Sequence, residues 1–201
     1  MTQIVLASGN SGKLREFSQL LSPLGFTLMP QSEFGVSDAD ETGLSFVENA
    51  IIKARHASEI TGLPALADDS GLEIDALHGA PGIYSSRYAG ANATDADNVA
   101  KVLNALCDVP ENERSARFQC ILVFMRHAKD PTPLICQGSW QGQILTEPVG
   151  DGGFGYDPIF RVAETDCSAA ELSSEQKHAV SHRGKAMRQF LEAFQYVRHL
   201  P

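Results

Sequence analysis

Two adjacent carboxylates and a hydroxyl stand together at Asp68, Asp69 and Ser70 of this 201-residue chain, and Gly71 follows them. Carboxylate oxygens are the ligands that Mg²⁺ prefers, and a carboxylate can also accept a proton from water. A β-turn, in which Asp and Ser bind their own backbone, is the plain alternative. The pattern therefore indicates either a turn or a site for metal and proton chemistry.

The flanking residues predict how these carboxylates are held. Residues 63–67 are mostly apolar and predict a short buried strand, whereas residues 72–77 alternate apolar and acidic and predict a half-exposed strand. Since neighbouring strand residues point to opposite faces, Asp68 and Asp69 share a face only if the backbone turns between them. Gly71 can supply that turn. We expect the carboxylates at the end of the first strand.

A second group of polar residues follows the apolar residues 3–7, and it comprises Ser8, Gly9, Asn10, Ser11, Gly12 and Lys13. A strand, a glycine-containing loop and a helix in this order direct backbone N–H groups at an anion. The segment is not a P-loop, because Leu14 takes the place of the magnesium-binding hydroxyl. A plain turn remains the alternative. Lys13 opposes the helix dipole and therefore favours a bound phosphate.

An acidic loop at residues 37–43, which includes Glu41, precedes a strongly predicted helix. Ser45 and Glu48 form a capping box, and Gly62 ends the helical pattern. Lys53 lies one turn after Asn49, so the two share a face. Taken alone, the acidic loop and Lys53 are typical of a solvated surface.

The third group lies near the C-terminal end. Residues 150–160 contain four glycines around Phe154 and Tyr156, and Pro158 excludes the helix of a dinucleotide-binding motif. Such a loop can hold a ring against a flat ligand, or the ring can plug the core. Ser181 is a good N-cap for a last helix, and the cation Arg183 at its positive end favours an anion or a carbonyl opposite.

The remaining segments predict an α/β fold in one domain over residues 1–201. Residues 79–90 form a loop that is a candidate interface, and Thr94 caps a helix. Residues 118–125 predict a strand buried on both faces. Two further strands are expected at residues 133–137 and 141–145, with Trp140 at the turn between them.

Composition excludes several classes of function. The chain has 43% apolar residues, 16 basic and 25 acidic residues and a net charge of −9, which argues against a nucleic-acid partner. Its four cysteines form no C-x-x-C pair, so neither a zinc site nor a disulfide framework is expected. No stretch has the length of a membrane span, and the N-terminus lacks a signal-peptide pattern. We expect a soluble, cytoplasmic protein without a membrane partner.

The separate groups agree on a polyphosphate ligand. Four cations lie beside candidate loops, namely Lys13, Lys53, Lys177 and Arg183, while carboxylates gather at Glu41, Asp68 and Asp69. An acidic protein needs a divalent cation between its carboxylates and a polyphosphate, because the two would otherwise repel. The sequence therefore predicts a divalent metal as the cofactor.

Six motifs resemble those of the ITPase-like family, the inosine/xanthosine triphosphate pyrophosphatases. They occur in the family's order and span nearly the whole chain: Ser8-Gly9-Asn10 with Lys13, Asn49-Ala50 with Lys53-Ala54, Asp68-Asp69-Ser70-Gly71-Leu72, Pro81-Gly82-Ile83-Tyr84-Ser85, Phe154-Gly155-Tyr156-Asp157-Pro158-Ile159-Phe160 and Ser181-His182-Arg183-Gly184-Lys185-Ala186. Ser8 replaces a frequent threonine and keeps its hydroxyl, whereas His178 stands where asparagine is common.

The resemblance implies a two-lobed α/β fold with a long mixed sheet, flanking helices, a cleft between the lobes, and a homodimer. It also implies Mg²⁺-dependent hydrolysis of ITP, dITP and XTP to the monophosphate and pyrophosphate. Asp69 would accept a proton or, with Glu41, hold the metal, while Asp68 and Lys53 would assist. The substrate would be bound by Ser8, Gly9, Asn10, Ser11, Gly12, Lys13, Ser70, Phe154, Gly155, Tyr156, Asp157, Lys177, His182 and Arg183.

Two alternatives remain open. One is a pyrophosphatase for another modified nucleotide, which would keep the same chemistry. The other is a nucleotide-sensing module without turnover, which would keep the phosphate loop and Phe154 but would not need Asp69. A P-loop kinase or GTPase is excluded, because Leu14 follows the lysine.

Overall fold

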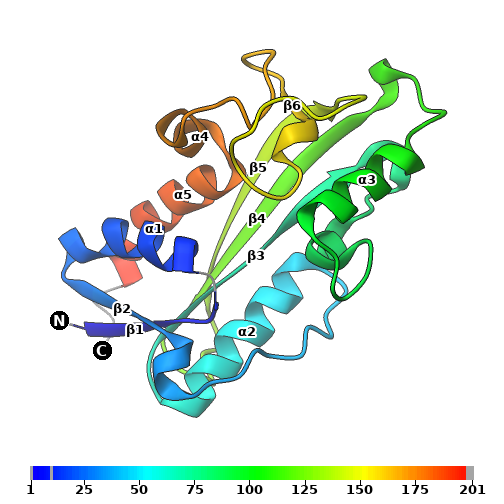
Figure 1. Ribbon diagram of the computed structural model, residues 1–201. Helices are drawn as coiled ribbons and strands as arrows, with labels where there is room; N and C mark the ends of the chain where they lie inside the picture. Colours follow the sequence, from blue (N-terminus) through cyan, green and yellow to red (C-terminus); the bar gives the residue numbers. More distant parts are fainter. Residues whose placement is uncertain (1, 10, 198–201) are drawn as a thin grey trace. The chain divides into compact units, whose positions relative to one another are not determined.

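The computed structural model describes residues 2–9 and 11–197, and within them six strands form one mixed sheet (Figure 1). The strand order is β2-β1-β3-β4-β5-β6. Strand β1 pairs in parallel with β2 and β3, whereas β5 and β6 are antiparallel. The bounds are β1 Thr2–Leu6, β2 Phe26–Pro30, β3 Ala65–Ile74, β4 Ser115–Met125, β5 Leu134–Ile144 and β6 Phe160–Val162.

Five α-helices flank the sheet in the described part of the chain, which confirms the predicted α/β fold with a mixed sheet. They are α1 Ser11–Leu21, α2 Phe46–Thr61, α3 Asp95–Ala105, α4 Ser174–Val180 and α5 His182–Val197. None of these helices is long and apolar enough to cross a membrane.

The helix ends follow the predicted capping residues. Ser45 accepts a hydrogen bond from the Glu48 N–H at the start of α2, and Gly62 ends that helix in the left-handed conformation. Thr94 begins α3 in a full capping box. The Oγ atom of Ser181 accepts from the Gly184 N–H, so it caps α5 as expected. Capping is therefore decided by the local sequence at these three helices.

The chain divides into two compact units that alternate along the sequence. Unit 1 comprises Met1–Asp69, Ile121–Cys136 and Gln189–Pro201, and unit 2 comprises Ser70–Cys120 and Gln137–Arg188. Strands β3, β4 and β5 and helix α5 each contribute residues to both units. The cleft and the single-domain organisation expected from the sequence remain predictions.

One hydrophobic cluster of unit 1 forms where α2 packs on the strands. Ala50, Ala54 and Ala57 lie on one side of α2 and are fully buried against Val5, Ala65 and Ala67 and the strand residues Ile121 and Val123. The three alanines recur at the spacing of one helix face. Since alanine has the smallest apolar side chain, the helix can lie close to the sheet. This brings Lys53, the neighbour of Ala54 in α2, near Asp69 of β3.

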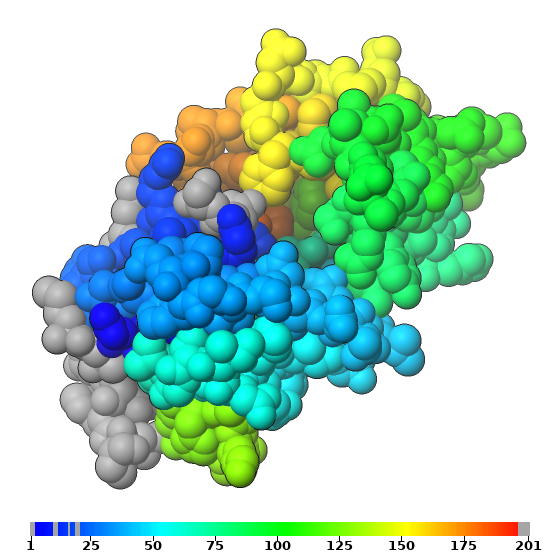
Figure 2. Space-filling view, turned by 60° about the horizontal axis from the view of Figure 1, so that its bottom comes forward, coloured from blue at the N-terminus to red at the C-terminus, as the bar shows by residue number. Residues whose placement is uncertain are grey.

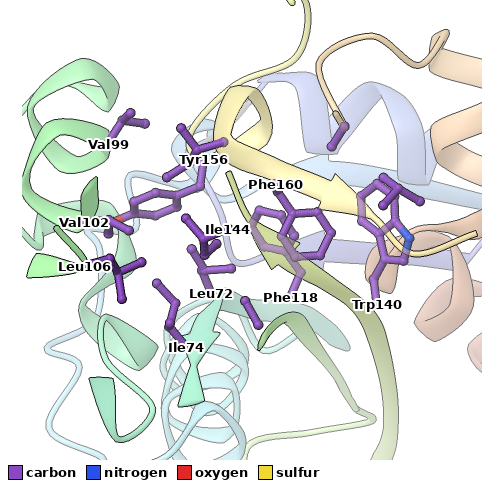
Figure 3. Packing of buried hydrophobic residues seen from close by; sticks show 14 residues of the cluster. Leu72, Ile74, Val99, Val102, Leu106, Phe118, Trp140, Ile144, Tyr156 and Phe160 are labelled. Atoms are coloured by element: carbon purple, nitrogen blue, oxygen red, sulfur yellow. The ribbon is translucent and has the colours of Figure 1, made fainter. Parts of the chain in front are cut away.

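A hydrophobic cluster in unit 2 includes the aromatic residues Phe118, Trp140, Tyr156 and Phe160 (Figure 3). Strand residues Phe118 and Trp140 alternate with polar neighbours that point to the other face of the sheet. Phe118 packs against Trp140 with ring centroids 6.2 Å apart. On the opposite side of the cluster, α3 contributes Val99 and Val102. This core fixes the strands on which the second part of the candidate site is built.

Two strand predictions were wrong, and each error concerns a glycine. The turn expected at Gly71 is absent, because β3 runs without a break from Ala65 to Ile74. Strand β5 is likewise continuous, and Trp140 lies fully buried inside it rather than at a turn. A Cβ atom on Gly138 would lie 1.9 Å from the His182 carbonyl oxygen, so this glycine permits close approach of another segment and does not mark a turn.

Several shorter elements were not predicted, and they include strand β6. Helix α4 was missed, although Ser173 caps it with Gln176 in a capping box. The loop at residues 79–90 contains the 3-10 helix Gly82–Arg87, where irregular structure was expected.

The β4–β5 connection contains an ion pair between a buried carboxylate and a partly exposed arginine, and we expect its contribution to stability to depend on pH. Asp130, which is 3% exposed, accepts from Arg126 Nε at 2.8 Å and Nη2 at 2.5 Å and from the Arg126 and Thr132 N–H groups. Hydrogen bonds from Arg126 hold the pKa of Asp130 well below its usual range. Replacing Asp130 by Asn should therefore lower the free energy of unfolding at pH 7 by about 2 kcal/mol.

The sign of this dependence follows from the lowered pKa. Stability from Asp130 is complete above the ordinary carboxyl pKa of about 4 and is lost as the pH falls toward the lower pKa of the folded state. Urea unfolding at pH 7 and pH 3 measures the difference between the wild type and D130N, which should shrink at pH 3. Exposed Asp151, changed to Asn, is the matched control. A cost that is equal at both pH values would contradict the assignment.

Candidate functional site

The two central carboxylates lie on opposite faces of β3 in unit 1. Asp68 Oδ2 lies 2.7 Å from Lys13 Nζ of α1, and Asp69 Oδ1 lies 2.6 Å from Lys53 Nζ of α2. The two helices lie on opposite sides of β1 (Figure 1). Because β3 continues without a break, the prediction that the carboxylates lie at a strand end was wrong. They lie inside the strand on opposite faces, and each meets a lysine from a different helix.

Glu41 joins the second of these ion pairs. Its Oε1 atom lies 3.3 Å from Lys53 Nζ, so one ammonium group contacts both Glu41 and Asp69. The Lys53 side chain is only 17% exposed, which distinguishes it from the solvated lysine that its sequence context alone suggests. The loop that carries Glu41 and helix α2 both reach the surface (Figure 2).

Burial and charge act in opposite directions on this pair. Burial raises the pKa of Asp69, and although Lys53 opposes the change, the net shift is upward. Burial lowers the pKa of Lys53, but the charges of Asp69, Asp68 and Glu41 outweigh it, so that pKa is also raised. A carboxylate whose pKa is raised toward neutrality is better matched to accept a proton from water at physiological pH.

The donor set of unit 1 fits a hard cation such as Mg²⁺. Asp69 is 9% exposed, and its Oδ2 atom has no hydrogen-bond partner in the described structure. Among the described residues, no group of three or more His, Cys, Asp or Glu side chains is arranged to hold a metal. Mg²⁺ does not require one, because it commonly binds one or two carboxylates together with waters and substrate phosphates. Asp69 and Glu41 are therefore the residues that could hold such a cation.

The predicted phosphate loop leads from β1 into α1, which begins at Ser11. Gly9 and Gly12 are exposed, and a Cβ atom on Gly9 would meet nothing within 4 Å. Lys13 lies in the first helical turn, as expected, and its cation is compensated by Asp68. Ser8 is half-buried. The prediction for Asn10 falls outside the described residues.

In unit 2, the loop after β5 presents Phe154 at the surface with 59% exposure. Lys177 Nζ and Arg183 Cζ lie 4.5 and 5.7 Å from the centre of its ring. Phe154 is therefore exposed and does not plug the core, so its ring is accessible to a flat ligand. A flat ligand with oxygen substituents would find a ring face and two cations together here.

Tyr156 has the opposite role, although it is only two residues away. It is 4% exposed and lies in the unit 2 core beside Val99 and Val102 of α3 (Figure 3). Its hydroxyl donates to the Ser85 carbonyl oxygen at 2.7 Å, and burial raises its pKa. Tyr156 therefore anchors the loop to the core of unit 2, while Phe154 remains exposed at the surface.

Asp157 connects this loop to α4. It is 2% exposed, forms an ion pair with Lys177 and accepts from the Phe154 N–H at 2.8 Å. A further anchor was missed from the sequence, because Asp95 accepts from the Gly155 N–H at 2.7 Å. Asp95 and Gly155 are 60 positions apart. In the sequence, Asp95 indicates only the start of a helix. Ser70, the first residue of unit 2, is half-buried in β3.

His182 and Arg183 open α5 at the end of an aromatic stack. The His182 ring lies 4.9 Å from Phe118 at an interplanar angle of 13°, and it is 6% exposed. Gly138 lets the backbone of this first turn lie directly on β5. His182 is thus a packed side chain, while Arg183 contacts the exposed Phe154 ring. The structure places these residues with Lys177 and Asp157 in unit 2.

The protein has a mixed α/β sheet. One unit carries paired carboxylates and lysines, and the other carries an exposed ring beside two cations. The chain belongs to the Ham1 family, whose profile matches residues 4–193. This confirms the kinship indicated by the six motifs.

Particular relatives are similar over nearly their whole length. A dITP/XTP pyrophosphatase of Vibrio cholerae is 60% identical over 198 residues, which cover 98% of this chain and 99% of the relative. The corresponding protein of Shewanella oneidensis is 63% identical over 97% of this chain and 95% of the relative. The solved structure of a HAM1 protein from Coxiella burnetii has a TM-score of 0.94 at 56% identity and covers 98% of this chain and 100% of that chain.

Proposed function

We propose that this protein is a nucleoside triphosphate pyrophosphatase that hydrolyses the non-standard purine nucleotides dITP, XTP and ITP to the monophosphate and pyrophosphate. The observation that carries the proposal is the Lys53 ammonium group that joins Asp69 and Glu41 in a chain 60% identical to a dITP/XTP pyrophosphatase. Cations and carboxylates placed together suit a triphosphate, which needs both charge neutralisation and a proton acceptor.

The reaction is an in-line displacement at the α-phosphorus. A water molecule attacks, Asp69 accepts its proton, and the bond to pyrophosphate breaks. Mg²⁺ held by Asp69 and Glu41 supplies Lewis-acid charge stabilisation when it is bound. Lys13 and Lys53 stabilise the charge that grows on the departing pyrophosphate. Since each ammonium group has three donors, it can hold a carboxylate and a phosphate oxygen at the same time.

Base recognition is assigned to unit 2. The base stacks on Phe154, which is exposed and therefore needs no rearrangement of the core. Lys177 and Arg183, which lie beside that ring, present cationic donors to a 6-oxo group. Adenine carries a 6-amino group there, so donor would face donor. Hypoxanthine and xanthine are thus preferred to adenine.

Pyrophosphate release from dITP, XTP, ITP, GTP and ATP tests the proposal, with each nucleotide measured in Mg²⁺ and again with a chelator. We expect metal-dependent release from dITP, XTP and ITP, with ATP at least about 100-fold slower in kcat/KM, since an unpaired buried donor costs a few kcal/mol.

Each other result of this assay has a defined meaning. Binding of dITP without release of pyrophosphate from any nucleotide would replace the proposal with a sensing module. Release without base preference would keep the chemistry and remove the roles given to Lys177 and Arg183. The homodimer, the cytoplasmic location and the absence of nucleic-acid and membrane partners remain predictions from the sequence.

A further inference from the structure

Asn49 occupies a position in α2 at which a polar side chain is costly. It is fully buried, whereas its neighbour Ala50 packs into the apolar core of unit 1. One helical turn separates it from Lys53, so both side chains lie on the same side of α2. Asn49 therefore lies next to the ion pairs of Asp69 and Glu41 without belonging to them.

One atom of Asn49 holds the loop that carries Glu41. Its Oδ1 atom accepts from the Gly43 N–H at 2.9 Å, two residues beyond Glu41. The fit is close, because a Cβ atom on Gly43 would lie 2.7 Å from this Oδ1 and 2.5 Å from the Glu48 Cβ. Glu48 holds the next residue through the Leu44 N–H at 3.0 Å. The loop is thus fixed to α2 immediately after Glu41.

The other end of the Asn49 amide has no such partner. Its Nδ2 atom is buried and makes no hydrogen bond within the described structure. A buried donor left unsatisfied costs about 1 to 3 kcal/mol, so an apolar residue of similar size would suit this position better for stability. Among the described residues, the Asn49 side chain makes one hydrogen bond, which is the acceptor contact with the Gly43 N–H.

We propose that Asn49 is a positioning residue for Glu41: its Oδ1 atom clamps Gly43 and thereby holds the Glu41 carboxylate beside Lys53 and Asp69. The inference rests on the proposed function, because Glu41 is assigned there to the metal. Partners that orient metal ligands without touching the metal commonly change metal affinity by about 10- to 100-fold. Asn49 does not contact the substrate or the reacting atoms in this assignment.

Asn49→Leu is the variant that separates positioning from folding. Leucine fills a similar volume, removes the acceptor for Gly43 and removes the unsatisfied donor, so the melting temperature should stay within a few degrees of the wild type. The free Mg²⁺ concentration for half-maximal pyrophosphate release from dITP should rise about 10-fold. In the E41Q background the same change should have less than about a 2-fold effect, because the residue that Asn49 positions is already altered.

Ser58→Ala is the matched control. Ser58 is also a buried polar residue of α2, and its Oγ donates to the Leu63 carbonyl oxygen at 2.8 Å, far from Glu41 along the helix. This variant should lower stability and leave the Mg²⁺ dependence unchanged. An unchanged Mg²⁺ dependence in N49L, or an equal loss in the E41Q background, would overturn the positioning role.

Hydrogen exchange at the Gly43 amide tests the clamp without any turnover. Exchange should be at least about 10-fold faster in N49L than in the wild type, since the amide loses its acceptor and its protection. Equal exchange in both proteins would overturn the clamp. If the wild type releases no pyrophosphate from any nucleotide, the proposed function fails, whereas this exchange measurement still decides whether Asn49 holds the loop.

Discussion

Replacing Asp69 by Asn should lower kcat for pyrophosphate release from dITP by about 1000-fold. The change removes the proposed proton acceptor and one negative charge from the proposed metal ligands, while the side-chain volume stays nearly constant. Nucleotide affinity should change by less than about 10-fold, since Lys13 and the base site of unit 2 remain intact. Steady-state kinetics and isothermal titration calorimetry with dITP measure the two quantities separately.

Glu73→Gln is the control for this variant. Glu73 is another carboxylate of β3 and is also ion-paired, in this case with Arg117 Nε at 3.2 Å. It has no role in the proposed mechanism, so turnover should stay near the wild-type rate. If D69N retained more than a tenth of wild-type turnover, Asp69 would be removed from the mechanism.

Replacing Gly138 by Ala should destabilise the protein by about 3 kcal/mol or more, because the new Cβ overlaps backbone that cannot rotate away. It would lie 1.9 Å from the His182 carbonyl oxygen and 2.7 Å from the Ala186 nitrogen. The first turn of α5 must therefore shift, and Arg183 moves with it. Protein that still folds should show a raised KM for dITP and a smaller change in kcat.

Ser139→Ala provides the comparison for Gly138. Ser139 is the next residue of β5 and points to the opposite face, where its Oγ accepts from Gln141. Thermal unfolding should shift by only a few degrees in S139A. A G138A protein with wild-type melting temperature and wild-type KM would show that α5 is not held against β5 as described.

The parts of the fold that the sequence predicted are those decided by neighbouring residues. Ser45, Gly62 and Thr94 sit at helix ends because capping depends on groups within four residues. The order of strand, loop and helix over residues 3–21 was also predicted from the local pattern, whereas the exposure of Phe154 was one of two alternatives that glycine spacing left open. Likewise, the face shared by Asn49 and Lys53 follows from helical spacing alone.

The positions of two glycines inside strands could not be predicted from their neighbours in the sequence. Gly71 and Gly138 resemble turn residues in sequence, yet both lie inside continuous strands. The reason for Gly138 lies 44 residues along the chain, at the His182 carbonyl that occupies the space of a side chain. Asp95, which holds Gly155 across 60 residues, is a similar case. Long-range contacts of this kind leave no local pattern.

The alternation of the two units along the chain has a consequence for how such a protein can change over time. The chain passes between the units four times, at residues 69/70, 120/121, 136/137 and 188/189. Neither unit is therefore a continuous segment that a gene fusion or a truncation could transfer or delete on its own. Transfer of unit 1 into another chain would require three separate segments, and transfer of unit 2 would require two.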